Sequence, residues 1–189
     1  VTSPMPELTG GVPSVRSRCR ITRDANAISI SLLADDPDPL ALISSVPTGQ
    51  TDQYLYEEDV LQLAIAWPGQ ASYAGFLLIN PHGNRKAVGE AKAWSTTQHR
   101  GDKSWIIKVT IPLPDPTPTA MGVSALRFFR GVNHEVHALG QSGPHPVDTA
   151  RMAVISLVPG DADTAGERFR TAAQRAKDAC TAKQVADIS

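Results

Sequence analysis

The sequence predicts an all-β domain of short antiparallel strands, arranged as a sandwich or a barrel, followed by one C-terminal α-helix. Three features support this prediction. Apolar and polar residues alternate along many short stretches, which is the pattern of strands with one buried face. Turn-forming segments such as residues 80–84, Asn-Pro-His-Gly-Asn, separate these stretches. Near the C-terminus the apolar residues change from a period of two to the period of a helix.

The first two strands are predicted to form a hairpin. Residues 15–21 alternate strictly between two faces. One face holds Val15, Ser17, Cys19 and Ile21, and the other holds Arg16, Arg18 and Arg20. The arginine side is interpreted as a solvated strand face. Residues 22–26 supply a turn, and residues 27–34 form the second strand.

The same alternation predicts the later strands, at residues 60–67, 73–79, 86–96, 105–111, 125–132, 136–139 and 152–158. The segment 112–118 is rich in proline, which cannot donate a ladder hydrogen bond, so it is predicted to be a loop.

A helix is predicted at residues 164–184. Thr164 and Glu167 form a capping-box pattern at its start. The residues that recur at helical spacing are Ala165, Phe169, Ala172, Ala176 and Cys180. We expect this stripe to lie on the sandwich or to lead into further sequence. The chain is thus divided into an extended lead-in (1–14), a sandwich domain (15–159) and a helical tail (160–189).

Composition is that of one soluble domain of 189 residues, with 41% hydrophobic and 20% charged residues. A net charge of −1 with dispersed Lys and Arg argues against a nucleic-acid surface, and no apolar run is long enough for a membrane span. No signal peptide is visible, so the chain is interpreted as a mature protein or a piece of a longer one. Cys19 and Cys180 could form one disulfide or remain free thiols, and the sequence leaves both open.

No catalytic motif is found, so the chain is not predicted to be an enzyme. The acidic segments 35–38 and 57–59 are the candidates for oxygen ligands of a cation. Asp35, Asp36 and Asp38 could hold a structural calcium ion, and the alternative is a solvated acidic loop.

Few aromatic residues are available for binding. Tyr56 lies in a polar stretch just before a strand, where an exposed ring could offer a flat face to a sugar. Trp94 could be a core residue or part of a sheet face, and Trp105 is most simply a core residue.

Four segments, in order, resemble family 9 carbohydrate-binding modules. These are Ala-Asp-Asp-Pro-Asp-Pro at 34–39, Tyr-Glu-Glu-Asp-Val-Leu-Gln-Leu at 56–63, the Phe-to-Gly segment 76–83 and Ser-Trp-Ile-Ile-Lys-Val-Thr-Ile-Pro at 104–112. The resemblance covers residues 15–157. It implies an antiparallel jelly-roll-like β-sandwich, often with structural calcium, attached to secreted polysaccharide-degrading enzymes. A secreted, periplasmic or cell-surface location follows from it.

The resemblance also implies where a sugar would bind. Tyr56 matches the family's first stacking aromatic, Asn80 its strand-end asparagine and Gln62 its acidic sugar contact. Leu78 stands where the family has a basic contact. The second stacking tryptophan has no counterpart in residues 138–147, where His145 is the only flat side chain.

The leading interpretation is a carbohydrate-binding module whose site includes Tyr56, Gln62, Asn80, Trp94 and His145. One alternative is a structural or protein-interaction sandwich without a sugar site, whose tail helix would dock or link. Another is a haem-binding sandwich with Met121, Met152, Lys86 or a histidine as axial ligands.

Overall fold

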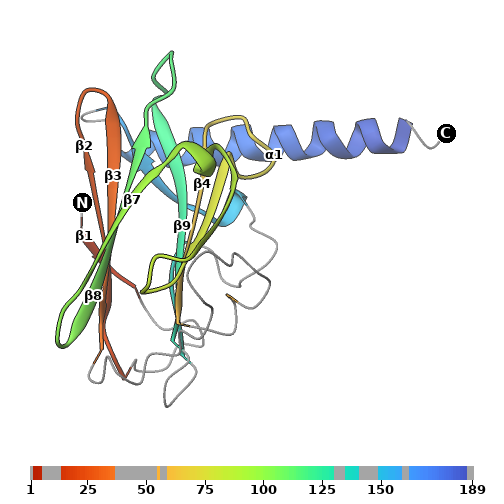
Figure 1. Ribbon diagram of the computed structural model, residues 1–189. Coiled ribbons are helices and arrows are strands. Elements are labelled where there is room, and N and C mark those ends of the chain that lie inside the picture. Colours follow the sequence, from red (N-terminus) through yellow and green to blue (C-terminus); the bar gives the residue numbers. More distant parts are fainter. Residues whose placement is uncertain are drawn as a thin grey trace.

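The computed structural model describes residues 2–5, 14–36, 55, 59–129, 135–140, 149–158 and 162–186. It confirms the predicted architecture. Two antiparallel sheets pack face to face, and one α-helix follows them (Figure 1). The two sheets are called sheet A and sheet B below.

Sheet A has five strands in the order β1-β2-β3-β8-β7. Their bounds are β1 Thr2–Pro4, β2 Ser17–Arg23, β3 Ala27–Asp35, β8 Ser104–Pro112 and β7 Ser95–Arg100. Sheet B has the order β10-β9-β4-β5-β6, and β11 also pairs with β9. Its bounds are β10 Glu135–Leu139, β9 Ala120–Phe129, β4 Val60–Ala66, β5 Gly75–Ile79, β6 Arg85–Gly89 and β11 Ala153–Ser156. The short 3-10 helices η2 and η3 span Glu90–Ala93 and Thr149–Arg151, and α1 spans Ala162–Ala186.

The strand predicted at residues 86–96 is the main error in the predicted order of elements. It is two strands in different sheets, since β6 ends at Gly89 and β7 begins at Ser95. Gly89 has φ 62°, a left-handed conformation that favours glycine and stops the strand. The 3-10 helix η2 then carries the chain from sheet B to sheet A. The alternation of small and larger residues continues across this break, so periodicity alone could not locate it.

Inward-facing residues of both sheets form the core of the sandwich. Alternate residues of β3 and β8, from Ile28 to Ala34 and from Trp105 to Ile111, are buried against Leu61, Leu63 and Ile65 of β4. The intervening residues of sheet A face outward and are exposed or half-buried. The arginine face predicted for β2 is confirmed, because Arg18 and Arg20 are exposed between buried neighbours.

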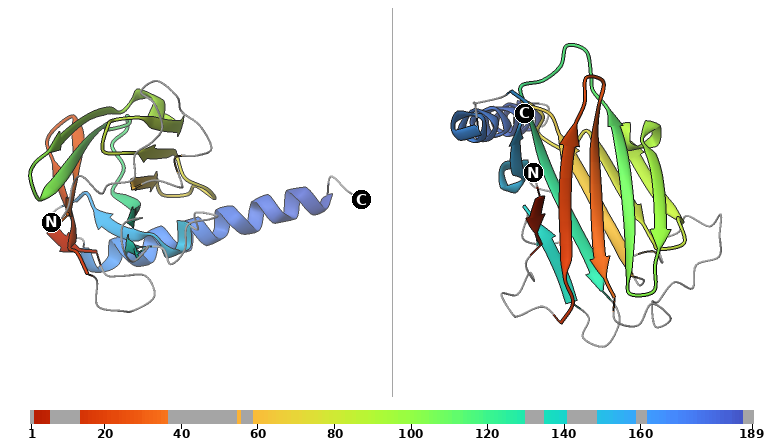
Figure 2. Two further views of the ribbon diagram at one scale, coloured as in Figure 1. Left: turned by 60° about the horizontal axis from the view of Figure 1, so that its bottom comes forward. Right: turned by 90° about the vertical axis from the view of Figure 1, so that its left-hand side faces the viewer.

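The central strands β4, β5 and β9 of sheet B, in contrast, are buried on their outer face as well. A second apolar cluster there includes Ala64, Phe76 and Leu126 together with Phe169 of α1. The helix contacts β11, η3 and β9 and lies along this side of the sandwich (Figure 2). Its close approach requires a glycine. A Cβ on Gly122 of β9 would lie 2.5 Å from Cζ of Phe169.

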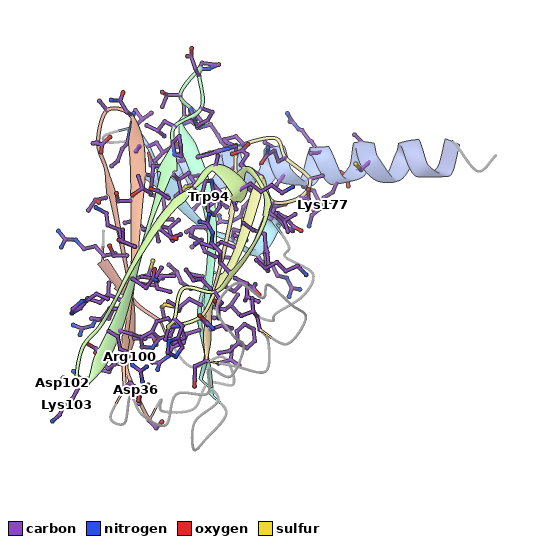
Figure 3. The ribbon with its side chains drawn as sticks, in the orientation of Figure 1. Asp36, Trp94, Arg100, Asp102, Lys103 and Lys177 are labelled. Atoms are coloured by element: carbon purple, nitrogen blue, oxygen red, sulfur yellow. The ribbon has the colours of Figure 1, made fainter. Side chains whose placement is uncertain are left out.

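Among the helix residues whose burial is described, 164–180, those in the first half of α1 pack on the sandwich. The residues of the helix that are buried are Ala165, Phe169 and Ala173. Ala172 and Ala176 are half-buried, and Cys180 is exposed. The predicted buried stripe is therefore confirmed near Phe169 and is wrong towards the C-terminus of the helix. The 25-residue helix runs out beyond the sheets, and Lys177 lies on this projecting part (Figures 1 and 3). Within the described residues, no helix is long and apolar enough to cross a membrane.

The two cysteines are free thiols in different environments. Cys19 is buried in the core of the sandwich, and Cys180 is exposed on the helix. Burial raises the pKa of the Cys19 thiol to about 12. Of the two possibilities that the sequence left open, the structure therefore has the free thiols.

Replacing Phe169 by alanine should lower the free energy of unfolding by about 3–5 kcal/mol, because a fully buried ring is lost from a packed site. Urea unfolding followed by circular dichroism measures the effect. Thr171→Ala, at an exposed position of the same helix, should change stability by no more than about 0.5 kcal/mol. Equal effects of the two variants would contradict the observed packing of α1.

Thiol labelling should separate the two cysteines. The thiolate is the reactive species, and the raised pKa of Cys19 keeps that thiol protonated at about pH 8. We therefore expect one equivalent of a chromogenic disulfide reagent to react quickly with the native protein, at Cys180, and the second equivalent to react only in denaturant. Cys180→Ser should abolish the fast phase and leave the slow phase intact.

Candidate functional site

Five of the eight residues predicted to bind a ligand or metal can be located. Gln62, Asn80, Trp94, Asp35 and Asp36 are among the described residues, whereas Tyr56, His145 and Asp38 lie outside them. The roles of these last three stay predictions from the sequence.

Gln62 lies on the outer face of sheet B, in an apolar setting. The strand register places it beside Leu78 of β5 and Leu126 of β9. The residue is fully buried, and neither Nε2 nor Oε1 of its carboxamide has a hydrogen-bond partner. The Oγ atom of Ser124, which pairs with Ala64 two residues further along β4, is also buried without a partner. A buried polar group without a hydrogen-bond partner lowers the free energy of unfolding by about 1–3 kcal/mol. Gln62 and Ser124 are therefore an unusual pair on this apolar face.

Asn80 holds the β5–β6 turn together. Its Oδ1 accepts hydrogen bonds from the backbone N–H of His82 at 3.0 Å and of Asn84 at 2.9 Å. The backbone N–H of Asn80 also donates to the carbonyl of Asn84 at 3.0 Å. Asn80 is fully buried, and its carboxamide oxygen serves this Asx-type turn. The side chain thus explains why the strand ends at this residue.

Trp94 belongs to the core of the sandwich. The indole is 3% exposed and packs over Gly75, where an added Cβ would lie 2.3 Å from Cζ2 of the ring. Figure 3 shows it in the upper part of the fold, between η2 and β7. Of the two positions predicted for Trp94, the structure has the core position, so its ring offers no exposed face for a sugar.

Asp35 and Asp36 point to opposite sides of the strand end. Asp35 faces outward, 3.5 Å from Nη2 of Arg18, and Asp36 faces inward, 3.9 Å from Nη2 of Arg127. Adjacent residues of an extended chain alternate in direction, and the two carboxylates accordingly face different arginines. Within the described residues no group of three His, Cys, Asp or Glu gathers in one place. Asp38, the third residue expected to bind calcium, lies outside them, so the calcium site stays a prediction from the sequence.

Arg127 is the buried functional group that sequence reasoning missed. It lies on the inner face of β9, fully buried, and donates hydrogen bonds to Oγ of Ser17 at 3.2 Å and to the carbonyl of Asp35 at 2.9 Å. With Asp36 it connects sheet B to the β2–β3 end of sheet A. The sequence does contain an indication of this buried charge, because Arg127 is the one charged residue in the apolar stretch 120–129.

Met121, Met152 and Lys86, three of the residues considered as haem ligands, do not come together. Met121 lies in the core between the sheets, whereas Met152 lies in the cluster under α1, on the other face of sheet B. Lys86 is exposed on β6. Two axial ligands must face one another across an iron atom, and no pair of these three does so.

No protein-family model and no curated protein matches the chain. Solved structures do share its fold. A family 9 carbohydrate-binding module from Caldicellulosiruptor kristjanssonii in complex with glucose has a TM-score of 0.60 at 14% identity, over 77% of this chain and 78% of that chain. A module from the same organism and family in complex with cellotriose gives 0.61 at 14% identity, over 80% of each chain.

A protein from Bacteroides uniformis, provisionally described as carbohydrate-binding, has a TM-score of 0.60 at 12% identity, over 82% of this chain and 85% of that chain. The chain has the fold of a family 9 carbohydrate-binding module. This family 9-like sandwich bears out the fold that the four sequence segments implied. At 12–14% identity these comparisons show the fold alone.

Replacing Gln62 by leucine should raise the free energy of unfolding by about 1–2 kcal/mol, because the unsatisfied carboxamide is exchanged for an apolar group of similar size. Chemical denaturation of both proteins measures the difference. Gln98→Leu, at an exposed position of β7, is the control and should leave stability nearly unchanged. A loss of stability in Gln62→Leu would show that the carboxamide has a partner in solution, such as a bound water molecule.

Proposed function

We propose that this chain is a non-catalytic carbohydrate-binding module. The observation that carries the proposal is the fold shared with two family 9 modules that are in complex with glucose and with cellotriose, over more than three-quarters of each chain. A secreted, periplasmic or cell-surface location, next to a polysaccharide-degrading activity, is part of the same proposal.

The position and burial of Gln62 also support the proposal. It occupies the strand position where the family resemblance implies a sugar contact, and its buried carboxamide has both a donor and an acceptor without partners. Such a group is costly for folding and is the kind of group that a ligand hydroxyl can satisfy. In the proposal, Tyr56 provides the flat apolar face and Gln62 provides the hydrogen bonds. Asn80 contributes by fixing the end of β5 rather than by its carboxamide oxygen, which the turn occupies.

The proposed site should bind a sugar with low affinity, for three reasons. One aromatic ring takes the place of two, Leu78 cannot replace a basic contact, and Gln62 must be reached by the ligand although it is fully buried in this structure. Binding then has to supply the free energy that exposes the carboxamide. We expect dissociation constants no tighter than about the millimolar range, roughly −4 kcal/mol.

Titration with neutral xylan- and glucan-derived oligosaccharides, followed by NMR and calorimetry, tests the proposal. Tyr56→Ala should abolish binding with the fold unchanged, and Gln62→Leu should weaken binding while raising stability. This opposite change in affinity and stability distinguishes a ligand-binding carboxamide from a structural one. Gln98→Leu is the matched control and should bind as the wild type does. Absence of binding across the panel would favour the structural or protein-interaction alternative.

A further inference from the structure

The outer face of sheet A is open to solvent. Figure 2 shows β2, β3, β8 and β7 side by side with no helix over them, since α1 lies on the other side of the molecule. The exposed fraction is 49% for the side chain of Arg18 and 37% for Ile106, near the middle of this face. The side chains of the face are therefore available to a partner without any rearrangement of the fold.

The strand register arranges these side chains in three rows that cross the sheet. One row consists of hydroxyl groups, from Thr22, Ser29, Thr110 and Ser95. The next row consists of Arg20, Ser31, Lys108 and Thr97. The third row consists of Arg18, Leu33, Ile106 and His99. Adjacent rows lie about 7 Å apart and adjacent strands about 4.8 Å apart. We call these three rows the sheet A platform.

The platform has an excess of positive charge, although the whole chain has a net charge of −1. Arg18, Arg20 and Lys108 are exposed on it, and Arg16 lies just before the start of β2. The carboxylate next to the platform at this end is Asp35, which lies 3.5 Å from Arg18. Asp24, in the turn at the other end, accepts hydrogen bonds from the backbone N–H of Asn26 and Ala27 at 2.8 Å each.

An open hollow of about 680 Å³ continues the platform at the Arg16 end. Its lining includes Arg16, Asp35, Lys103 and Ser104. Lys103 belongs to the β7–β8 hairpin, which lies close to Asp36 at the lower end of the sandwich in Figure 3. The lining also includes Asp36, so the hollow has two cations, two carboxylates and two serine hydroxyl groups, and the net positive charge lies on the three rows of the platform.

The chemistry of the three rows fits one class of polymer. Arginine binds carboxylates through paired hydrogen bonds, and the row of hydroxyl groups can donate to and accept from sugar hydroxyls. Leu33 and Ile106 form an apolar strip between Arg18 and His99 that suits the C–H face of a sugar ring. Single-stranded nucleic acid would require aromatic rings for base stacking, and the three rows contain no phenyl, phenol or indole ring. The major groove of a duplex admits an α-helix or a two-stranded ribbon, whereas the three rows lie on the face of a sheet of at least four strands.

We infer that the sheet A platform binds an acidic polysaccharide, a chain of sugar residues that carry carboxylates. This site lies on the opposite side of the sandwich from Gln62 and does not depend on the neutral sugar site proposed above. In the sequence alone, Arg16, Arg18 and Arg20 indicated a solvated face. The register with Ser31, Lys108 and Thr97 is what turns that face into a candidate binding surface.

The experiment measures binding to a polyuronate by calorimetry or affinity electrophoresis. The same polymer with its carboxylates methyl-esterified is the matched ligand control, because it keeps the sugar and loses the charge. We expect binding to the polyuronate alone, and we expect it to weaken as salt rises from about 0.1 M to about 1 M, where the screening length falls from about 10 Å to about 3 Å. Arg18→Gln/Arg20→Gln should reduce affinity by at least about tenfold.

Arg170→Gln/Arg175→Gln changes the net charge equally at two exposed positions of α1 and should leave affinity unchanged. An equal loss in this control would overturn the inference, because it would show attraction to overall charge. Equal binding of the esterified polymer, equal or tighter binding of single-stranded DNA, or no binding of the polyuronate would overturn it as well. Neutral oligosaccharides, tested on the same variants, report separately on the proposed function, because Arg18 and Arg20 take no part in that site.

Discussion

The central strands of sheet B are buried on both faces, and much of the rest of the structure follows from that constraint. All seven residues of β4 are buried, on one side against sheet A and on the other within the cluster that includes Phe169. A sandwich normally leaves one face of each sheet to solvent. Here the outer face of sheet B is apolar, and leaving it exposed would forgo about 25 cal/mol for each square ångström of apolar surface. The first half of α1 covers the part of this face formed by β9 and β11, and Gly122 is needed to let the helix approach.

Arg127 lies in the solvent-excluded core between the two sheets, and this position determines its interactions. A guanidinium between two packed sheets must be paired, and it finds Asp36, Ser17 and the carbonyl of Asp35 at one end of sheet A. Buried ion pairs contribute little net stability, but removing one partner is costly because the other charge is left behind. We therefore interpret this cluster as a constraint on how the two sheets align. Asp35 is paired with Arg18 at the same end of the sandwich, so both carboxylates at the end of β3 lie beside an arginine.

Local patterns predicted sheet A well because its strands β2, β3 and β8 each have one face buried and one face exposed to solvent. The alternation in β2, β3 and β8 reports one buried and one exposed side, and these strands lie close to their predicted residues. A strand buried on both sides loses the alternation, and β9 begins at Ala120, five residues before its predicted start at 125. The candidate site was predicted less well, because burial depends on contacts between distant segments that no local pattern reports. Trp94 is in the core because Gly75 leaves room for its ring, and Asp36 is neutralised by Arg127, which lies more than ninety residues later.

The two outer faces of the sandwich impose different conditions on a ligand. On sheet B a ligand must displace packed side chains to reach Gln62, so the free energy of its hydrogen bonds is offset by the packing that it disrupts. On sheet A the side chains are already exposed and regularly spaced, and a ligand need only displace water and counterions. Single exposed charge pairs contribute little, typically less than about 1 kcal/mol. A polymer changes this balance, because its repeating groups meet repeating side chains and each bound group raises the effective concentration of the next. The exposed face of sheet A, with its repeated side chains, is thus better suited to a long, charged polymer than to a small sugar.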